Sequence, residues 1–102
     1  MSRSQPYASA SDNTGSWTLR FSPDAERELK KLDNSVRNLA LDRATWLAEY
    51  FDSITPLPLH AEWSGYYKWR ASDYRIVYKI NYNARILYIE HVRHRNLVYK
   101  RR

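Results

Sequence analysis

Residues 65–78 read GYYKWRASDYRIVY, and apolar and polar side chains alternate along this stretch. At residues 67–70 aromatic side chains alternate with lysine and arginine, a period of two that is typical of a half-buried β-strand. The same period returns at residues 76–81 and 86–92, with short polar segments between the runs. The pattern therefore predicts three consecutive strands joined by turns, which form a meander.

The N-terminal half follows a different pattern. Residues 17–21, WTLRF, alternate as a strand does, and Ser22 and Pro23 follow them. A serine that caps the helix, followed by proline at the first helical position, predicts a helix start. This helix is expected to run to about Leu32.

A second helix is expected to begin after a break at residues 33–35. Its apolar side chains recur at spacings of three and four, which gives one buried stripe. The stripe consists of Val36, Leu39, Ala44, Leu47, Phe51 and Ile54, and Trp46 and Tyr50 widen it. Pro56 and Pro58 cannot continue a helix, so the helix should end before them.

The predicted order of elements is β-α-α-β-β-β. We therefore expect an α+β fold, with two N-terminal helices packed on one face of a small, largely antiparallel sheet. Residues 17–102 should form this single domain. Residues 1–16 are rich in serine and polar residues and are expected to form a flexible tail.

Positive charge is concentrated in the second part of the chain. The whole chain carries a net charge of +6, but residues 63–102 hold ten Lys/Arg and only two Asp/Glu, a net charge of +8. Such a segment repels itself unless an anion lies nearby, and a phosphate backbone is the commonest anion of this kind. The alternative is a solvated basic surface that binds no ligand.

Composition excludes several kinds of chemistry. The chain has no cysteine, which rules out disulfides and thiolate zinc sites and fits the cytoplasm as the expected location. His91 and His94 are three residues apart, and residues three apart in a strand point to opposite faces. We therefore expect no metal site and no cofactor. Two glycines are too few for a glycine-rich phosphate loop, and no apolar run approaches the roughly 18 residues that span a bilayer.

Cations and tyrosines remain as the candidate chemical groups. RNA cleavage without a metal needs a base for the 2′-OH, positive charge at the phosphoryl oxygens and an acid for the departing 5′ oxygen. The basic side chains that could meet on one surface of the sheet are Lys68, Arg70, Arg75, Arg93 and Arg95. The alternative for each arginine is an exposed side chain without a ligand, and for each tyrosine a role in sheet packing.

Two stretches resemble a known family. Residues 65–78 resemble the "YxxRxGDYRxxY" core of the RelE/ParE toxin superfamily, and residues 91–99, HVRHRNLVY, resemble its "VGHRxxVY" segment. The resemblance covers about residues 17–102 and implies the fold expected above. It also implies a toxin of a type II toxin–antitoxin system, with a RelB-like antitoxin as its partner.

The resemblance implies roles for individual residues. Arg75 would stabilise the phosphate, Lys68 would act as general acid, Arg95 would be the second catalytic arginine, and Tyr99 would stack on a base. The further residues expected to bind RNA are Arg70, Tyr74, Arg93, Lys100 and Arg101.

Three positions depart from the family pattern. Tyr66 stands where some RelE toxins have a lysine proposed as the base, so the general base stays open. Asp73 stands at a family glycine position and should alter the turn. Arg93 stands where glycine is usual, so Arg93 and Arg95 both remain candidates for the second catalytic arginine.

The resulting hypothesis is a metal-independent mRNA endonuclease, an mRNA interferase. RelE-like members of the superfamily cleave mRNA in the A site of the 70S ribosome, and the same activity is expected here. One alternative is a ParE-like toxin that binds DNA gyrase. Another is a nucleic-acid-binding relative without catalysis.

Overall fold

The structure is a computed structural model that describes residues 17–95. The tail expected at residues 1–16, and the predicted site residues Tyr99, Lys100 and Arg101, lie outside these residues. The helices are α2 (Pro23–Lys30) and α3 (Asn34–Glu49), with 3-10 turns η1 (Phe51–Ser53) and η2 (Ala61–Trp63). The strands are β1 (Thr18–Phe21), β2 (Leu57–Pro58), β3 (Tyr67–Ala71), β4 (Tyr74–Asn81) and β5 (Ile86–His94).

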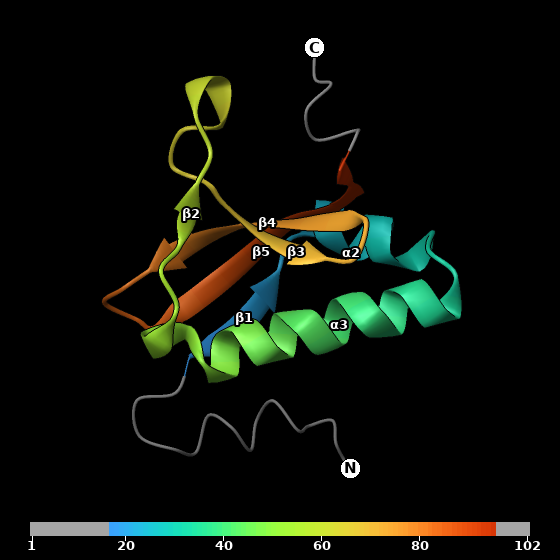
Figure 1. The fold of residues 1–102 in the computed structure, drawn as a ribbon, viewed down its shortest axis with the longest axis horizontal. Coiled ribbons are helices and arrows are strands. Elements are labelled where there is room, and N and C mark those ends of the chain that lie inside the picture. The colour runs from blue at the N-terminus through green and yellow to red at the C-terminus, as the bar shows by residue number, and fades with distance from the viewer. Residues whose placement is uncertain (1–16, 96–102) are drawn as a thin grey trace.

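The strands form one sheet in the order β1-β5-β4-β3-β2. Every neighbouring pair is antiparallel except β1 and β5, which run parallel. The long helix α3 crosses one face of this sheet (Figure 1). The predicted α+β fold, with helices followed by a largely antiparallel sheet, is thus confirmed. In residues 17–95, no helix is long and apolar enough to cross a membrane.

The start of α2 also follows the prediction. The Ser22 hydroxyl accepts a hydrogen bond from the Ala25 N–H at 3.0 Å, and Pro23 occupies the first turn. The same hydroxyl donates to the Glu90 carbonyl at 2.9 Å, and the Ser22 N–H donates to the Ile89 carbonyl at 2.9 Å. Ser22 therefore caps the helix and fixes α2 beside β5.

The end of α3 differs from the prediction. The helix ends at Glu49 instead of near Ile54, and the 3-10 turn η1 turns Phe51 into the core. Trp46 and Tyr50 were expected to widen the buried stripe, but they are 47% and 46% exposed. The physical reason is that α3 lies close to the sheet through small side chains, so its buried stripe is narrow. The buried residues of α3 are Ala40, Ala44, Leu47 and Ala48.

The two residues of β2 were expected only to end the preceding helix, but they extend the sheet. Leu57 pairs with Lys68, and Pro58 pairs with Tyr67. A proline is tolerated here because β2 is an edge strand, where its missing N–H costs no ladder hydrogen bond.

The turn between β3 and β4 consists of two residues, Ser72 and Asp73, which connect the paired Ala71 and Tyr74. Ser72 has a φ of 59°, and Asp73 has no positive φ. The departure at Asp73 therefore requires no left-handed backbone at that position.

A loop at residues 59–66 covers part of the sheet face that is turned away from α3 (Figure 1). The Leu59 N–H donates to the Tyr66 carbonyl at 2.9 Å, which closes the loop. Leu59 and Val77 are buried beneath it, with Trp63 and Tyr66 packed against them. This small apolar cluster is separate from the main core between the sheet and the helices.

Candidate RNA-binding face

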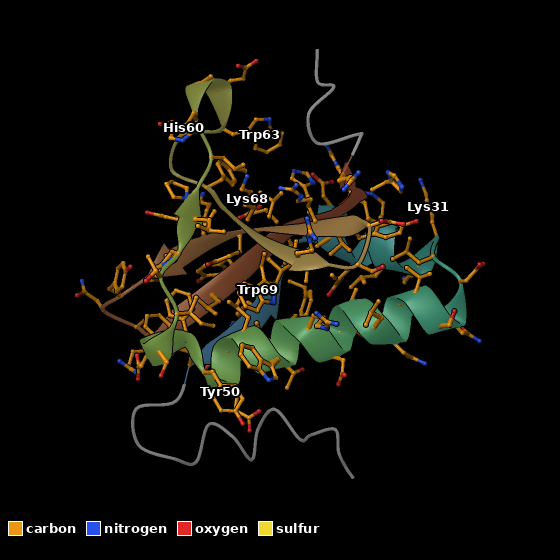
Figure 2. All side chains as sticks on the ribbon, viewed as in Figure 1. Lys31, Tyr50, His60, Trp63, Lys68 and Trp69 are labelled. Carbon is orange, nitrogen blue, oxygen red and sulfur yellow. The ribbon has the colours of Figure 1, made fainter. Side chains whose placement is uncertain are left out.

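Basic side chains collect on the sheet face that is turned away from α3. Successive side chains along a strand point to opposite faces of the sheet. The residues directly before and after a core residue in the same strand therefore point to this face. In Figure 2, Lys68 lies on the upper side of the sheet, and its neighbour Trp69 lies between the sheet and α3. We call this surface the cationic face, and it carries Lys68, Arg70, Arg75, Lys79 and Arg93.

The three arginines of the cationic face form a row across the sheet. Arg70 pairs with Arg75 between β3 and β4, and Arg75 pairs with Arg93 between β4 and β5. Adjacent strands lie about 4.8 Å apart, so the row spans about 10 Å at the backbone. A row of this length suits a phosphodiester and its neighbouring phosphate oxygens, because guanidinium groups bind such oxygens in pairs.

A second row lies beside the first. Lys68 pairs with Val77, and Val77 pairs with His91. Val77 is fully buried under the loop at 59–66, so the apolar cluster of this loop separates the lysine from the imidazole. Lys68, to which the family resemblance assigns the role of general acid, lies in this row.

Glu28 of α2 contacts three groups at the edge of this face. Beyond the end of β1, α2 lies along β5, and the Glu28 carboxylate accepts the Val92 N–H at 2.8 Å. Its other oxygen accepts the Arg93 Nε–H at 2.8 Å and lies 3.3 Å from His91 Nδ1. The carboxylate therefore replaces a neighbouring strand at this edge and offsets part of the charge of Arg93.

Arg95 lies beyond the end of β5, beside the turn that joins β3 and β4. Its N–H donates to the Asp73 carbonyl at 2.9 Å, and its side chain is exposed. The backbone contact holds Arg95 at the end of the β5 strand that carries Arg93. The two candidates for the second arginine thus differ, because the Arg93 side chain is paired with the Glu28 carboxylate, whereas Arg95 is held through its backbone N–H.

Tyr74 lies on the opposite face from Arg75. It packs against the main core, and its ring meets the His94 ring edge to face at 5.4 Å. The structure therefore does not bring Tyr74 to the cationic face. Tyr78 also faces the core, and burial raises the pKa of its hydroxyl, which keeps it protonated at neutral pH.

Aromatic side chains border the cationic face at the loop. Trp63 meets Tyr66 at 5.4 Å and His91 at 5.6 Å, in each case edge to face. Lys79 Nζ lies 5.3 Å from the centre of the Tyr66 ring. Within residues 17–95, no group of three or more His, Asp or Glu side chains could hold a metal ion.

Sequence reasoning missed Glu28, His91 and Trp63. Glu28 and His91 are 63 residues apart in the chain, and no local pattern connects them. His91 could have been placed on the cationic face, because it lies two residues before Arg93 in the same predicted strand. Trp63 lies in a loop whose path over the sheet no periodicity reveals.

Comparison with known proteins supports this description. Residues 19–99 match the family model described as the ParE toxin of type II toxin–antitoxin systems. No curated protein matches the chain. A chain of the toxin–antitoxin complex RelBE2 of Mycobacterium tuberculosis is similar, with 28% identity and a TM-score of 0.70, over 78% of this chain and 98% of that one.

Two further solved structures are similar. An arginine double mutant of the Escherichia coli toxin RelE, in the free state, is 25% identical, with a TM-score of 0.62 over 78% of this chain and 83% of that one. A chain of the archaeal RelE–RelB complex from Pyrococcus horikoshii is 19% identical, with a TM-score of 0.60 over 78% and 96% of the two chains. This chain belongs to the ParE toxin family of type II toxin–antitoxin systems, and its fold is similar to those of the RelE-type toxins above.

Proposed function

We propose that this toxin is an mRNA endonuclease that works on the 70S ribosome and cleaves mRNA in the A site without a metal. The observation that carries the proposal is the row of Arg70, Arg75 and Arg93 on one sheet face, with Lys68 in the next row. A surface that concentrates guanidinium groups at phosphate spacing favours a bound polyanion. The ribosome would supply the alignment of mRNA that a face of this size does not provide.

The cleavage step would use the 2′-OH of the mRNA. The 2′ oxygen attacks the phosphorus, the bond from phosphorus to the 5′ oxygen breaks, and the Lys68 ammonium gives a proton to that oxygen. Arg75 and Arg95 would stabilise the negative charge that builds up on the phosphoryl oxygens. Arg95 is preferred to Arg93 as the second catalytic arginine because Glu28 already offsets part of the charge of Arg93.

The remaining predicted residues would bind RNA. Tyr99 is proposed to stack on a base, and Arg93 is proposed to hold a neighbouring phosphate. The other proposed RNA contacts are Arg70, Tyr74, Lys100 and Arg101. Tyr74 would need RNA to reach the end of the sheet beside His94, because its ring faces away from Arg75.

An antitoxin is the proposed protein partner. Several similar structures are toxin–antitoxin complexes, with RelB in one and DinJ in another. A RelB-like acidic antitoxin that covers the cationic face would block RNA and neutralise the charge of residues 63–102. The binding should weaken as salt rises, since exposed charges are screened. The proposed place of action is the cytoplasm, where ribosomes are.

A gyrase-directed toxin is the second candidate. The matching family model is that of the ParE toxin. In addition, Arg93 forms an ion pair with Glu28, so this arginine has a structural role. A non-catalytic relative that only binds nucleic acid is the third. Both alternatives would leave mRNA intact.

Controlled expression in a bacterial host separates these functions. The endonuclease predicts growth arrest with cleavage of translated mRNA within minutes, without induction of the DNA damage response. Growth arrest with DNA damage signalling and intact mRNA would replace the proposal with gyrase poisoning. An untranslated copy of the same transcript is the control, because ribosome-dependent cleavage should spare it.

A further inference from the structure

A third row of side chains crosses the cationic face near the hairpin that joins β4 and β5. Arg20 of β1 pairs with Tyr88 of β5, and Tyr88 pairs with Lys79 of β4. Paired residues of adjacent strands point to the same face, so the tyrosine ring lies between two cations. Lys79 Nζ is also placed by the Tyr66 ring, whose centre lies 5.3 Å away. We call Arg20, Tyr88 and Lys79 the Tyr88 row.

A β-bulge turns Tyr88 toward this face. Val77 pairs with His91, but the next residue, Tyr78, pairs with Ile89, so β5 has one extra residue at this point. Tyr78 and Ile89 are buried in the main core, and Tyr88, next to Ile89, therefore points away from the core. The bulge places Tyr88 on the same face as His91, three residues further along, which an unbroken strand would not do. Bulges often re-aim a side chain in this way beside a functional site.

The Tyr88 ring is open to solvent at the wall of a shallow hollow. Tyr88 is 37% exposed although β5 is an inner strand of the sheet, and Arg20 and Lys79 are exposed as well. The hollow is lined by Lys79, Tyr88 and residues 80–83. Its volume of about 460 Å³ lies within the roughly 300–1,000 Å³ that is usual for ligand sites. An aromatic ring with this exposure is accessible to a flat ligand.

The Tyr88 row is separate from the arginine row. Lys79 lies four residues after Arg75 on β4, which is about 13 Å along the strand. Between the two rows, the apolar cluster of the loop at 59–66 covers Val77. A ligand at Tyr88 therefore does not occupy the place proposed for the scissile phosphate.

We infer that the Tyr88 row binds an unpaired nucleotide of RNA outside the cleavage site. The base stacks on the Tyr88 ring, and the phosphates on either side of this nucleotide lie at Arg20 and Lys79. This inference rests on the proposed function, because it takes RNA as the ligand. It adds a second contact with RNA, which increases affinity and takes no part in the chemical step.

The row provides the two kinds of contact that proteins make with single-stranded nucleic acids. Aromatic rings stack on bases of any sequence, and cations follow the backbone. Neighbouring strands are about 4.8 Å apart, so Arg20 and Lys79 flank the ring about 10 Å from each other at the backbone. The amide groups of Asn81 and Asn83 at the hollow can hydrogen-bond to base edges. In a double helix the bases are stacked on one another, so only an unpaired nucleotide can reach the ring.

Binding of a single-stranded 2′-O-methyl RNA tests the inference without cleavage, because a methylated 2′ oxygen cannot attack. A strand of about 12 nucleotides has the length of known single-strand sites, and fluorescence anisotropy measures its Kd. Tyr88→Ala should weaken binding roughly 5- to 150-fold, the value of one stacked base. Tyr88→Phe keeps the ring and should bind like wild type. The same strand annealed to its complement should bind wild type and Tyr88→Ala equally.

The salt dependence of this binding separates the ring from the cations. Arg20→Gln and Lys79→Gln should each reduce the slope of log affinity against log salt by about 0.7, because each variant loses one phosphate contact. Tyr88→Ala should leave the slope unchanged. Slopes that stay at the wild-type value in both charge variants would remove the phosphates from this row and overturn the inference.

Tyr50→Ala is the matched control, because Tyr50 is a similarly exposed tyrosine at the end of α3 and points away from the sheet (Figure 2). It should bind like wild type. Tyr88→Thr is a second variant that guards against misfolding, because threonine suits a strand. If folded Tyr88→Ala and Tyr88→Thr bind the single strand as tightly as wild type, or lose equal affinity for the single strand and the duplex, the inference is wrong.

Cross-linking on ribosomes that carry mRNA identifies the source of the nucleotide. With Tyr88 replaced by a photoreactive benzoylphenylalanine, a cross-link to mRNA or to ribosomal RNA supports the inference and names the strand. Cross-links to ribosomal protein alone would overturn it. Failure of wild type to cleave ribosome-bound mRNA would refute the proposed function instead, and the binding comparison would still be readable.

Discussion

Arg70 lies directly opposite Arg75 in the antiparallel pair β3–β4, and Arg75 lies directly opposite Arg93 in β4–β5. Like charges opposite each other destabilise a sheet. The protein therefore keeps a row of arginines at a cost in folding free energy. Such a cost is expected where a site must bind an anion, because sites selected for function often reduce stability.

Replacing the outer member of this row should make the free toxin more stable. For Arg70→Thr we expect the free energy of unfolding to rise by a few tenths to about 1 kcal/mol, because one like-charge pair is removed. Urea unfolding measures this change as a shift of the midpoint, provided that the dependence of the unfolding free energy on urea concentration is unchanged. Arg20→Thr on β1 is the matched control, because Arg20 pairs with Tyr88 and not with an arginine. An equal gain in both variants would trace the effect to threonine itself.

Arg75→Ala should abolish most of the activity while the protein stays folded. Loss of one donor to a developing oxyanion costs roughly 3–4 kcal/mol, so kcat on ribosome-bound mRNA should fall about 10²–10³-fold. Single-turnover cleavage measures it. Arg27→Ala, on the exposed side of α2, should cleave like wild type. Full activity in folded Arg75→Ala would remove Arg75 from the mechanism.

Glu28→Ala should destabilise the fold through the open edge of β5. The substitution leaves the Val92 N–H and Arg93 without the carboxylate that they share, and an unsatisfied buried donor costs about 1–3 kcal/mol. Glu28→Gln keeps an acceptor oxygen and should lose less. Thermal unfolding of the two variants compares them, and equal losses would show that the acceptor at Val92 is unimportant.

Asp52 should make stability depend on acid pH. Hydrogen bonds from the Trp17 indole and from Arg85 lower the pKa of this carboxyl below its ordinary value. A lowered pKa contributes stability that is present above about pH 4 and disappears as pH falls through the folded value. Wild type should thus exceed Asp52→Asn in urea midpoint at neutral pH, with a difference that shrinks in acid. A difference that stays constant from pH 7 to about pH 2 would contradict this account.

The sequence predicted those elements whose cause is local. The serine cap at Ser22 and the alternation along β3, β4 and β5 depend on neighbouring residues, and both are found in the structure. The placement of Lys68, Arg70 and Arg75 on one face follows from the same alternation. Features that depend on contacts between distant segments could not be predicted in this way.

Two features of this kind were not predicted, one at the site and one on α3. Glu28 reaches His91 and Arg93 because α2 lies along β5, which depends on how the whole sheet is ordered. Trp46 and Tyr50 stay exposed because alanines bring α3 close to the sheet. The spacing of apolar residues predicts which side of a helix is buried, but it does not predict how closely the helix approaches the sheet. The roles of Tyr99, Lys100 and Arg101 stay predictions.

The most direct test of the central claim is cleavage of a defined mRNA on purified 70S ribosomes, with the chemical ends of the fragments mapped. Attack by the 2′-OH predicts a cut at the A-site codon that leaves a 2′,3′-cyclic phosphate and a 5′-OH, and no cut when ribosomes are omitted. Intact mRNA on programmed ribosomes, or fragments that end in a 3′-OH and a 5′-phosphate, would contradict the account.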